Sequence, residues 1–146
     1  MTTEEDFITH QKRGRKSKAS GLDFEKRTRV HLESFGWIVS KFPNKPVDGK
    51  LVAAKNMFRG PGIPMAMGTG FPDFIAYKPI YLEGVLVYRV IFVECKVAKY
   101  LSETEREMAR WYLANKYCSA FHVAYRTKEK NKIKVNLLNY KDVKNG

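Results

Sequence analysis

The sequence predicts an α/β fold in which a central mixed sheet is flanked by helices, and three kinds of segment indicate it. The run from Val85 to Val93 (VLVYRVIFV) is almost continuously apolar, rich in β-branched and aromatic residues, and too short to favour a helix. Residues 23–35 and 102–116 carry apolar side chains at helical spacing. Residues 119–126 and 133–138 again have the composition of strands. With 146 residues, 44% of them hydrophobic, the chain suits one domain with a sizeable core.

The chain begins with a polar arm over residues 1–20, followed by a single folded domain over residues 21–146. We expect the arm to be flexible until it meets an anionic backbone. A localisation signal or a solubilising tail would have the same composition. The basic side chains of the arm are Lys12, Arg13, Arg15, Lys16 and Lys18.

The first helix is predicted over Asp23–Phe35. At about 100° per residue, Glu25 falls at the edge of the apolar stripe of this helix, near Leu32. The stripe consists of Phe24, Thr28, Leu32 and Phe35.

A long basic segment follows, from Lys41 to Gly70, and four prolines interrupt it. It shows no evident secondary structure, so we expect a long loop that is either functional or flexible. Its glycines at Gly68 and Gly70 would let backbone approach a phosphate closely. The basic residues that could line a nucleic-acid groove here are Lys45, Lys50, Lys55 and Arg59.

The next elements are two strands with a wide connection between them. A strand over Asp73–Tyr77 is predicted, with Pro72 at the entry position, where a missing N–H does least harm. We expect residues 78–84 to form a wide hairpin connection to the run from Val85. Antiparallel pairing across this connection would bring Asp73 beside Glu94.

The second helix is predicted from an N-cap at Ser102 to about Lys116. Glu105 at the third helical position completes a capping box with Ser102. Strands over Ser119–Arg126 and Ile133–Leu138 follow, joined by a charged turn. The last strand is amphipathic, which is typical of a sheet edge.

The carboxylates and the amine near the end of the central strand form the candidate site. Side chains alternate along a strand, so Glu94 and Lys96 point to one face while Cys95 points to the other. A carboxylate that closes so apolar a run is costly unless it is paired or holds a metal. Together Asp73 and Glu94 suit Mg²⁺ or Mn²⁺, and the backbone carbonyl of Cys95 would add a ligand. Lys96 would orient an attacking water or neutralise developing charge, which favours phosphodiester hydrolysis.

Pro72-Asp73 followed by Glu94-x-Lys96 resembles the signature of the PD-(D/E)XK nuclease superfamily, and the resemblance extends from about Leu22 to Arg126. The most similar groups are the archaeal Holliday junction resolvases and the VRR-Nuc domains. The resemblance implies a restriction-endonuclease-like αβββαβ core and a Mg²⁺-dependent endodeoxyribonuclease in DNA recombination or repair. It also implies a homodimer acting on branched or duplex DNA. In this family an acid at the position of Glu25, as in the pair Phe24-Glu25, assists metal or water binding.

Several alternatives remain open within this interpretation. Glu105 is either a helix cap or an accessory site residue. The second role is considered because VRR-Nuc domains usually carry glutamine at this position, after a pair like Leu101-Ser102. The activity could instead be that of a VRR-Nuc-like, nicking, restriction or homing nuclease on ordinary duplex. A catalytically inactive DNA-binding module, or a basic RNA-binding protein, would have the same composition.

Composition limits which other classes of protein are compatible with the sequence. The 27 Lys and Arg against 15 Asp and Glu give a formal charge of +12, which attracts phosphate backbones. A Gly-x-x-x-x-Gly-Lys-Ser/Thr motif is absent from the sequence, which argues against nucleotide hydrolysis. No run of eighteen apolar residues and no signal-like start occur, so we expect a soluble, cytoplasmic protein without membrane contact. The cysteines Cys95 and Cys118 lack metal-ligand spacing and are predicted to be buried thiols, and the three histidines form no cluster.

Overall fold

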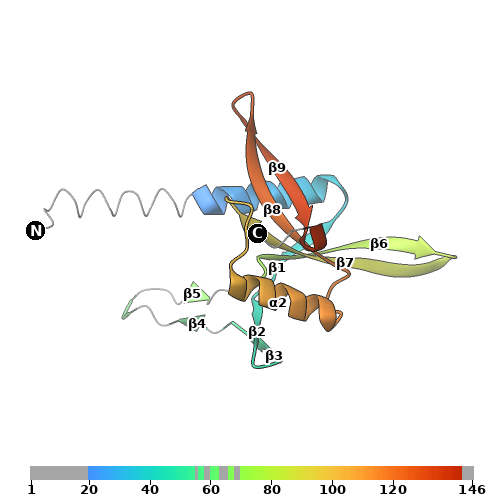
Figure 1. Cartoon of the computed structure of the whole chain (residues 1–146), viewed down its shortest axis with the longest axis horizontal. Helices are drawn as coiled ribbons and strands as arrows, with labels where there is room; N and C mark the ends of the chain where they lie inside the picture. The colour runs from blue at the N-terminus through green and yellow to red at the C-terminus, as the bar shows by residue number, and fades with distance from the viewer. Residues whose placement is uncertain (1–19, 55, 58–59, 63–65, 68–69, 143–146) are drawn as a thin grey trace, which may run out of the picture.

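The computed structural model describes residues 20–54, 56–57, 60–62, 66–67 and 70–142. Its centre is a five-stranded sheet in the order β1-β6-β7-β8-β9, with a helix on each face (Figure 1). The elements are α1 (residues 20–34), β1 (Ile38–Lys41), β2 (Asn44–Val47), β3 (Lys50–Ala53), β4 (Asn56–Met57), β5 (Ala66–Met67), β6 (Phe74–Leu82), β7 (Val85–Lys96), α2 (Glu103–Ala114), β8 (Ala120–Glu129), β9 (Lys132–Asn139) and a 3₁₀ turn (Tyr140–Asp142).

The sheet is mixed, as predicted. Strand β7 pairs with β8 in parallel, and the other three pairs are antiparallel. A parallel pair needs a crossover, and α2 supplies it between β7 and β8. Among the described residues, no helix is long and apolar enough to cross a membrane.

Helix α1 covers one face of the sheet through the predicted stripe, with one exception. Phe24, Thr28 and Leu32 are buried, but Phe35 is 63% exposed, so its predicted place in the core is wrong. The helix ends at residue 34, and the Phe35 N–H bonds to the Leu32 carbonyl in a tighter turn. Gly36, with φ of 85°, then reverses the chain, so the helical period no longer applies at Phe35.

The alternation along β7 is confirmed in its second half. Ile91 and Val93 pack into the core under α1, whereas Phe92 packs into the core under α2. An apolar run of this kind is typical of a buried strand, but the first half of β7 is not buried, since Val85 and Leu86 are exposed. Here the β6–β7 hairpin extends past both helices and projects from the body of the molecule (Figure 1).

The connection over residues 78–84, predicted to be wide, is a tight turn. Strand β6 continues to Leu82, which pairs with Val85, so only Glu83 and Gly84 form the turn. Both have positive φ, 49° and 79°, which is the geometry of a two-residue hairpin turn. The charged turn after β8 is likewise reduced to Lys130 and Asn131, with φ of 48° and 63°.

The segment between β1 and β6 is not a structureless loop. Its first part is the hairpin β2–β3, in which Lys45 and Lys50 are exposed. Gly70 does not leave room for a phosphate, because a Cβ there would lie 2.4 Å from the Phe42 carbonyl oxygen. The glycine instead lets two stretches of this chain pack closely, directly before Asp73. Gly68, Lys55 and Arg59, together with Thr69, lie outside the described residues.

Helix α2 begins with the predicted capping box. The Ser102 hydroxyl accepts from the Glu105 N–H at 3.2 Å, and Glu105 Oε1 accepts from the Ser102 N–H at 2.9 Å. Tyr112 is fully buried against the sheet, and its hydroxyl donates to the Phe71 carbonyl at 2.5 Å. Strand β9 lies at the sheet edge, as predicted.

Candidate active site

The candidate site lies at the end of the sheet where β6 begins and β7 ends. Asp73 immediately precedes β6, while Glu94 and Lys96 are among the last residues of β7. Because these strands are antiparallel, their opposite ends meet, and the predicted approach of Asp73 to Glu94 is confirmed. The Asp73 N–H donates to Glu94 Oε2 at 2.9 Å, and the Cys95 N–H donates to Asp73 Oδ2 at 2.9 Å. The backbone therefore fixes both carboxylates.

Helix α2 contributes Glu105, which closes the predicted capping box and also forms an ion pair with Lys96. Its Oε1 closes the capping box, while its Oε2 lies 2.6 Å from Lys96 Nζ. The Lys96 ammonium is farther from Glu94 Oε1, at 3.9 Å. The nearest ion-pair partner of Lys96 is thus the helix acid, not the strand acid.

Helix α1 and strand β1 contribute a second ion pair beside Asp73. Glu25 accepts a hydrogen bond from the Lys41 ammonium, which also lies 4.9 Å from the centre of the Phe74 ring. Asp73 responds to both charges: Glu25 raises its pKa and Lys41 lowers it. Lys41 was predicted only as the start of a basic loop. Its place in the site follows from β1, which pairs Lys41 with Phe74 and had not been predicted as a strand.

Burial dominates the electrostatics of the two central acids. The Glu94 side chain belongs to a residue only 8% exposed, and burial together with the charge of Asp73 raises its pKa from 4.5 to about 9. Lys96 opposes this shift without cancelling it. Burial also raises the pKa of Asp73. Both shifts favour retention of a proton by the pair, as expected for two adjacent carboxylates that are largely removed from solvent without a cation between them.

The donor set fits a hard divalent cation. Asp73 Oδ2 and Glu94 Oε2 accept backbone hydrogen bonds, which leaves Oδ1 and Oε1 as the oxygens for an ion. In a β-strand, the N–H and the C=O of one residue point toward the same side. Because the Cys95 N–H bonds to Asp73, the Cys95 carbonyl is also directed toward Asp73. Nowhere in the described part of the chain do three or more His, Cys, Asp or Glu side chains gather as a metal cage. Magnesium suits two carboxylates with water and phosphate oxygens completing its shell.

The thiols do not belong to this chemistry. The Cys95 side chain packs against the core under α1, and its pKa is raised by burial and by the charge of Asp73. Burial raises the pKa of Cys118 to about 11. Both cysteines are free, and a thiol that stays protonated is a poor nucleophile.

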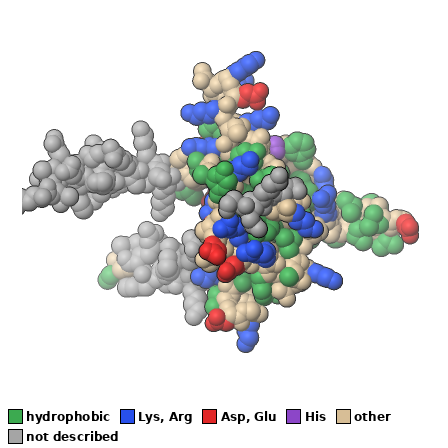
Figure 2. Space-filling model, viewed as in Figure 1, with side chains coloured by type: hydrophobic (Ala, Val, Ile, Leu, Met, Phe, Trp, Pro, Cys, Tyr) green, Lys and Arg blue, Asp and Glu red, His purple; other side chains and the backbone are tan. Residues whose placement is uncertain are grey.

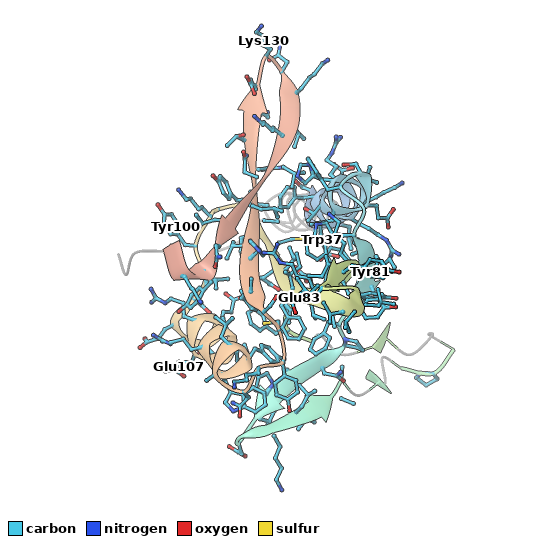
Figure 3. The ribbon with its side chains drawn as sticks, turned by 90° about the vertical axis from the view of Figure 1, so that its right-hand side faces the viewer. Trp37, Tyr81, Glu83, Tyr100, Glu107 and Lys130 are labelled. Atoms are coloured by element: carbon cyan, nitrogen blue, oxygen red, sulfur yellow. The ribbon has the colours of Figure 1, made fainter. Side chains whose placement is uncertain are left out.

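Basic side chains gather in a groove that sequence spacing could not reveal. The groove, of about 810 Å³, lies between α1 and the β8–β9 hairpin. Asp23 is paired with Arg27 at 2.7 Å and Glu129 with Lys134 at 3.6 Å. The basic residues that line it are Lys26, Arg27, Lys130, Lys132 and Lys134; Lys130 stands at the tip of the hairpin (Figure 3).

Ser20 was predicted as the last residue of the arm. Ser20 is part of α1, and its hydroxyl accepts a hydrogen bond from Arg126 Nη1 at 3.1 Å. The predicted basic residues of the arm, Lys12, Arg13, Arg15, Lys16 and Lys18, lie outside the described residues.

In comparisons with known proteins, the chain matches no family model, no curated protein and no solved structure.

Proposed function

We propose that this chain is a metal-dependent DNA endonuclease that hydrolyses phosphodiester bonds. The observation that carries the proposal is the interlocked pair of Asp73 and Glu94 with Lys96 at its edge. Glu94 is buried and Asp73 is half-buried, and burial raises the pKa of both carboxyl groups; acids with pKa values perturbed in this way are commonly found at functional sites. A purely structural role would be served better by apolar residues here.

The order of elements supports membership of the PD-(D/E)XK superfamily. With β2–β5 as an insertion, the chain runs α1, β1, β6, β7, α2, β8, which has the sequence of an αβββαβ restriction-endonuclease-like core. The candidate residues occupy the positions this core would require: the acid of the first helix, the start of the second core strand and the end of the third. The pair Phe24-Glu25 early in the first helix, the small size and the charge of +12 are similar to junction resolvases, so the substrate we propose is branched DNA.

The residues divide the chemistry among them. Asp73, Glu94 and the Cys95 carbonyl would hold Mg²⁺, or Mn²⁺ in its place. When bound, the ion would polarise the scissile phosphate and lower the pKa of a bound water. Lys96 would neutralise charge that develops on the phosphate or orient the water, and Glu105 would hold the Lys96 ammonium in place. The charges of Glu25 and Lys41 would set the electrostatic potential at the Asp73 carboxylate.

Cleavage of a substrate panel tests the proposal. The panel contains a four-way junction, a flap, a single strand and linear and supercoiled duplex, each with Mg²⁺, Mn²⁺ or chelator. Asp73→Asn should remove cleavage and leave binding intact or tighter, because it deletes a ligand and a negative charge near phosphate. Asp48→Asn, in the β2–β3 turn, is the matched control and should cut like the wild type.

The outcomes separate the alternatives. Symmetric junction cuts that Asp73→Asn abolishes would establish a resolvase, while cutting of plain duplex would favour a nicking, restriction or homing-type enzyme. Binding without cleavage in any metal would contradict the proposed enzyme and indicate a binding module.

A further inference from the structure

The outer half of the β6–β7 hairpin exposes large apolar side chains on a projecting arm. Tyr81, Leu82 and Val85 are 73%, 58% and 61% exposed, and Leu86 and Tyr88 are exposed as well. In Figure 2 this arm is an almost continuous apolar surface that ends in one acidic side chain. A contiguous exposed patch of this kind marks an interaction surface.

The charge on the arm excludes a phosphate backbone as its natural partner. Between Pro79 and Tyr88 the sequence contains no Lys or Arg, and Glu83 at the turn is the sole charge. Side chains that wedge into DNA are accompanied by basic residues, and a carboxylate at the tip would repel phosphates. The partner must therefore offer apolar surface and, at the tip, positive charge.

The same hairpin carries that positive charge at its base. Lys78 and Arg89 are cross-strand partners, and both lie over the Trp37 ring, at 5.1 and 6.0 Å from its centre. Alternation along the strands places them on the face that also bears the pair Leu82 and Val85. Lys78 at the base and Glu83 at the tip are five positions apart, a distance of about 16 Å in an extended strand. Figure 3 looks onto this tip, with Trp37 near the base.

We propose that this face of the β6–β7 hairpin binds a second copy of the chain, with the two hairpins side by side and antiparallel. In that arrangement Glu83 of each copy meets Lys78 and Arg89 of the other. The apolar side chains that share this face, which are Ile80, Leu82, Val85 and Val87, pack against those of the partner copy, whereas Tyr81, Leu86 and Tyr88 lie on the opposite face. The interface is self-complementary, as a two-fold axis requires.

The active-site residues do not take part in this contact. They lie where β6 begins and β7 ends, at the opposite end of both strands from the turn at Glu83. Both sites would stay open in the dimer. The proposal therefore stands independently of the proposed function: a dimer without cleavage would support it, and a monomer would overturn it whether or not the chain cleaves DNA.

A charge-reversal experiment on the full chain tests the arrangement. Sedimentation equilibrium would compare the wild type with Glu83→Lys and with the double variant Lys78→Glu/Arg89→Glu. Each change acts twice in a two-fold interface and replaces attraction by repulsion, so each variant should dimerise at least about tenfold more weakly. Glu129→Lys in the β8–β9 hairpin makes the same charge change elsewhere and should dimerise like the wild type.

An equimolar mixture of the two charge variants is the decisive sample. In a mixed dimer both tips again face bases of opposite charge, so dimers should return, which misfolded variants could not achieve. A monomeric wild type, a mixture that stays monomeric, or variants that dimerise like the wild type would each overturn the proposal. Loss of dimers in Leu82→Ser/Val85→Ser would further support the apolar contact.

Discussion

The backbone N–H of Asp73 donates a hydrogen bond to Glu94 Oε2, so the chain itself holds these two acids together. The reciprocal bond from the Cys95 N–H to Asp73 completes the lock. Neither carboxylate can turn away from the other without losing a backbone partner in a buried setting. Their proximity is therefore built into the strand pairing, and either a retained proton or a bound cation would relieve the repulsion between them.

Stability without metal should fall as pH rises. The pKa of Glu94 lies near 9 in the folded chain and at 4.5 without burial, so the folded state holds more protons between these values. The contribution of Glu94 to the free energy of unfolding is therefore fully present below about pH 4.5. It declines as the pH rises toward 9, by at most about 1.4 kcal/mol per pH unit. Urea unfolding in chelator should show the decline in the wild type but not in Glu94→Gln. A Glu94→Gln profile as steep as that of the wild type would exclude Glu94 as the source.

Magnesium binding should release protons. An ion that occupies the Asp73–Glu94 pair must displace the proton that burial retains there, so its affinity should rise between pH 6 and pH 8. Calorimetry at fixed pH in two buffers of different ionisation enthalpy would measure the release. The same release in Asp73→Asn and wild type would place the ion elsewhere.

The two tasks of Glu105 can be separated by one substitution. Glu105→Gln keeps the side chain that closes the capping box but removes the charge next to Lys96. We expect nearly unchanged thermal stability and a loss of cleavage of roughly tenfold, since Lys96 would no longer be held. Ser102→Ala is the matched control, which should cost about 1 kcal/mol of stability and leave cleavage intact. A loss of stability with intact cleavage in Glu105→Gln would indicate that Glu105 serves only as a helix cap.

Deletion of residues 1–19 should weaken DNA binding mainly at low salt. Each phosphate contact contributes about 0.9 to the slope of binding against salt concentration, so loss of the arm should flatten that slope. Ser20 must remain, because it holds Arg126. Titrations at several salt concentrations would measure the slope. If the deletion leaves the salt slope unchanged while Lys130→Glu/Lys132→Glu flattens it, the groove beside α1 contacts the phosphates and the arm does not.

Local signals in the sequence were sufficient for several elements. The helical stripe of α1, the capping box of α2, the alternation in the second half of β7 and the edge position of β9 were all predicted. Each depends on a period or a cap that a few neighbouring residues define. The pairing of Asp73 with Glu94 was also within reach, because one hairpin joins them.

Long-range packing decided the rest. Strand β1 and the role of Lys41 depend on pairing with β6. The hairpin β2–β3 was hidden by Pro46 within β2 and Pro43 just before it. The projecting half of β6–β7 looks like a core strand in sequence, because hydrophobicity does not say whether another element covers it. The sequence by itself determined which residues could form strands, helices and a metal-binding acid pair. Only the tertiary structure decided that Glu105 pairs with Lys96 and that the outer half of the β6–β7 hairpin is exposed to solvent. Both depend on where helix α2 and helix α1 lie relative to strand β7, which local sequence patterns do not specify.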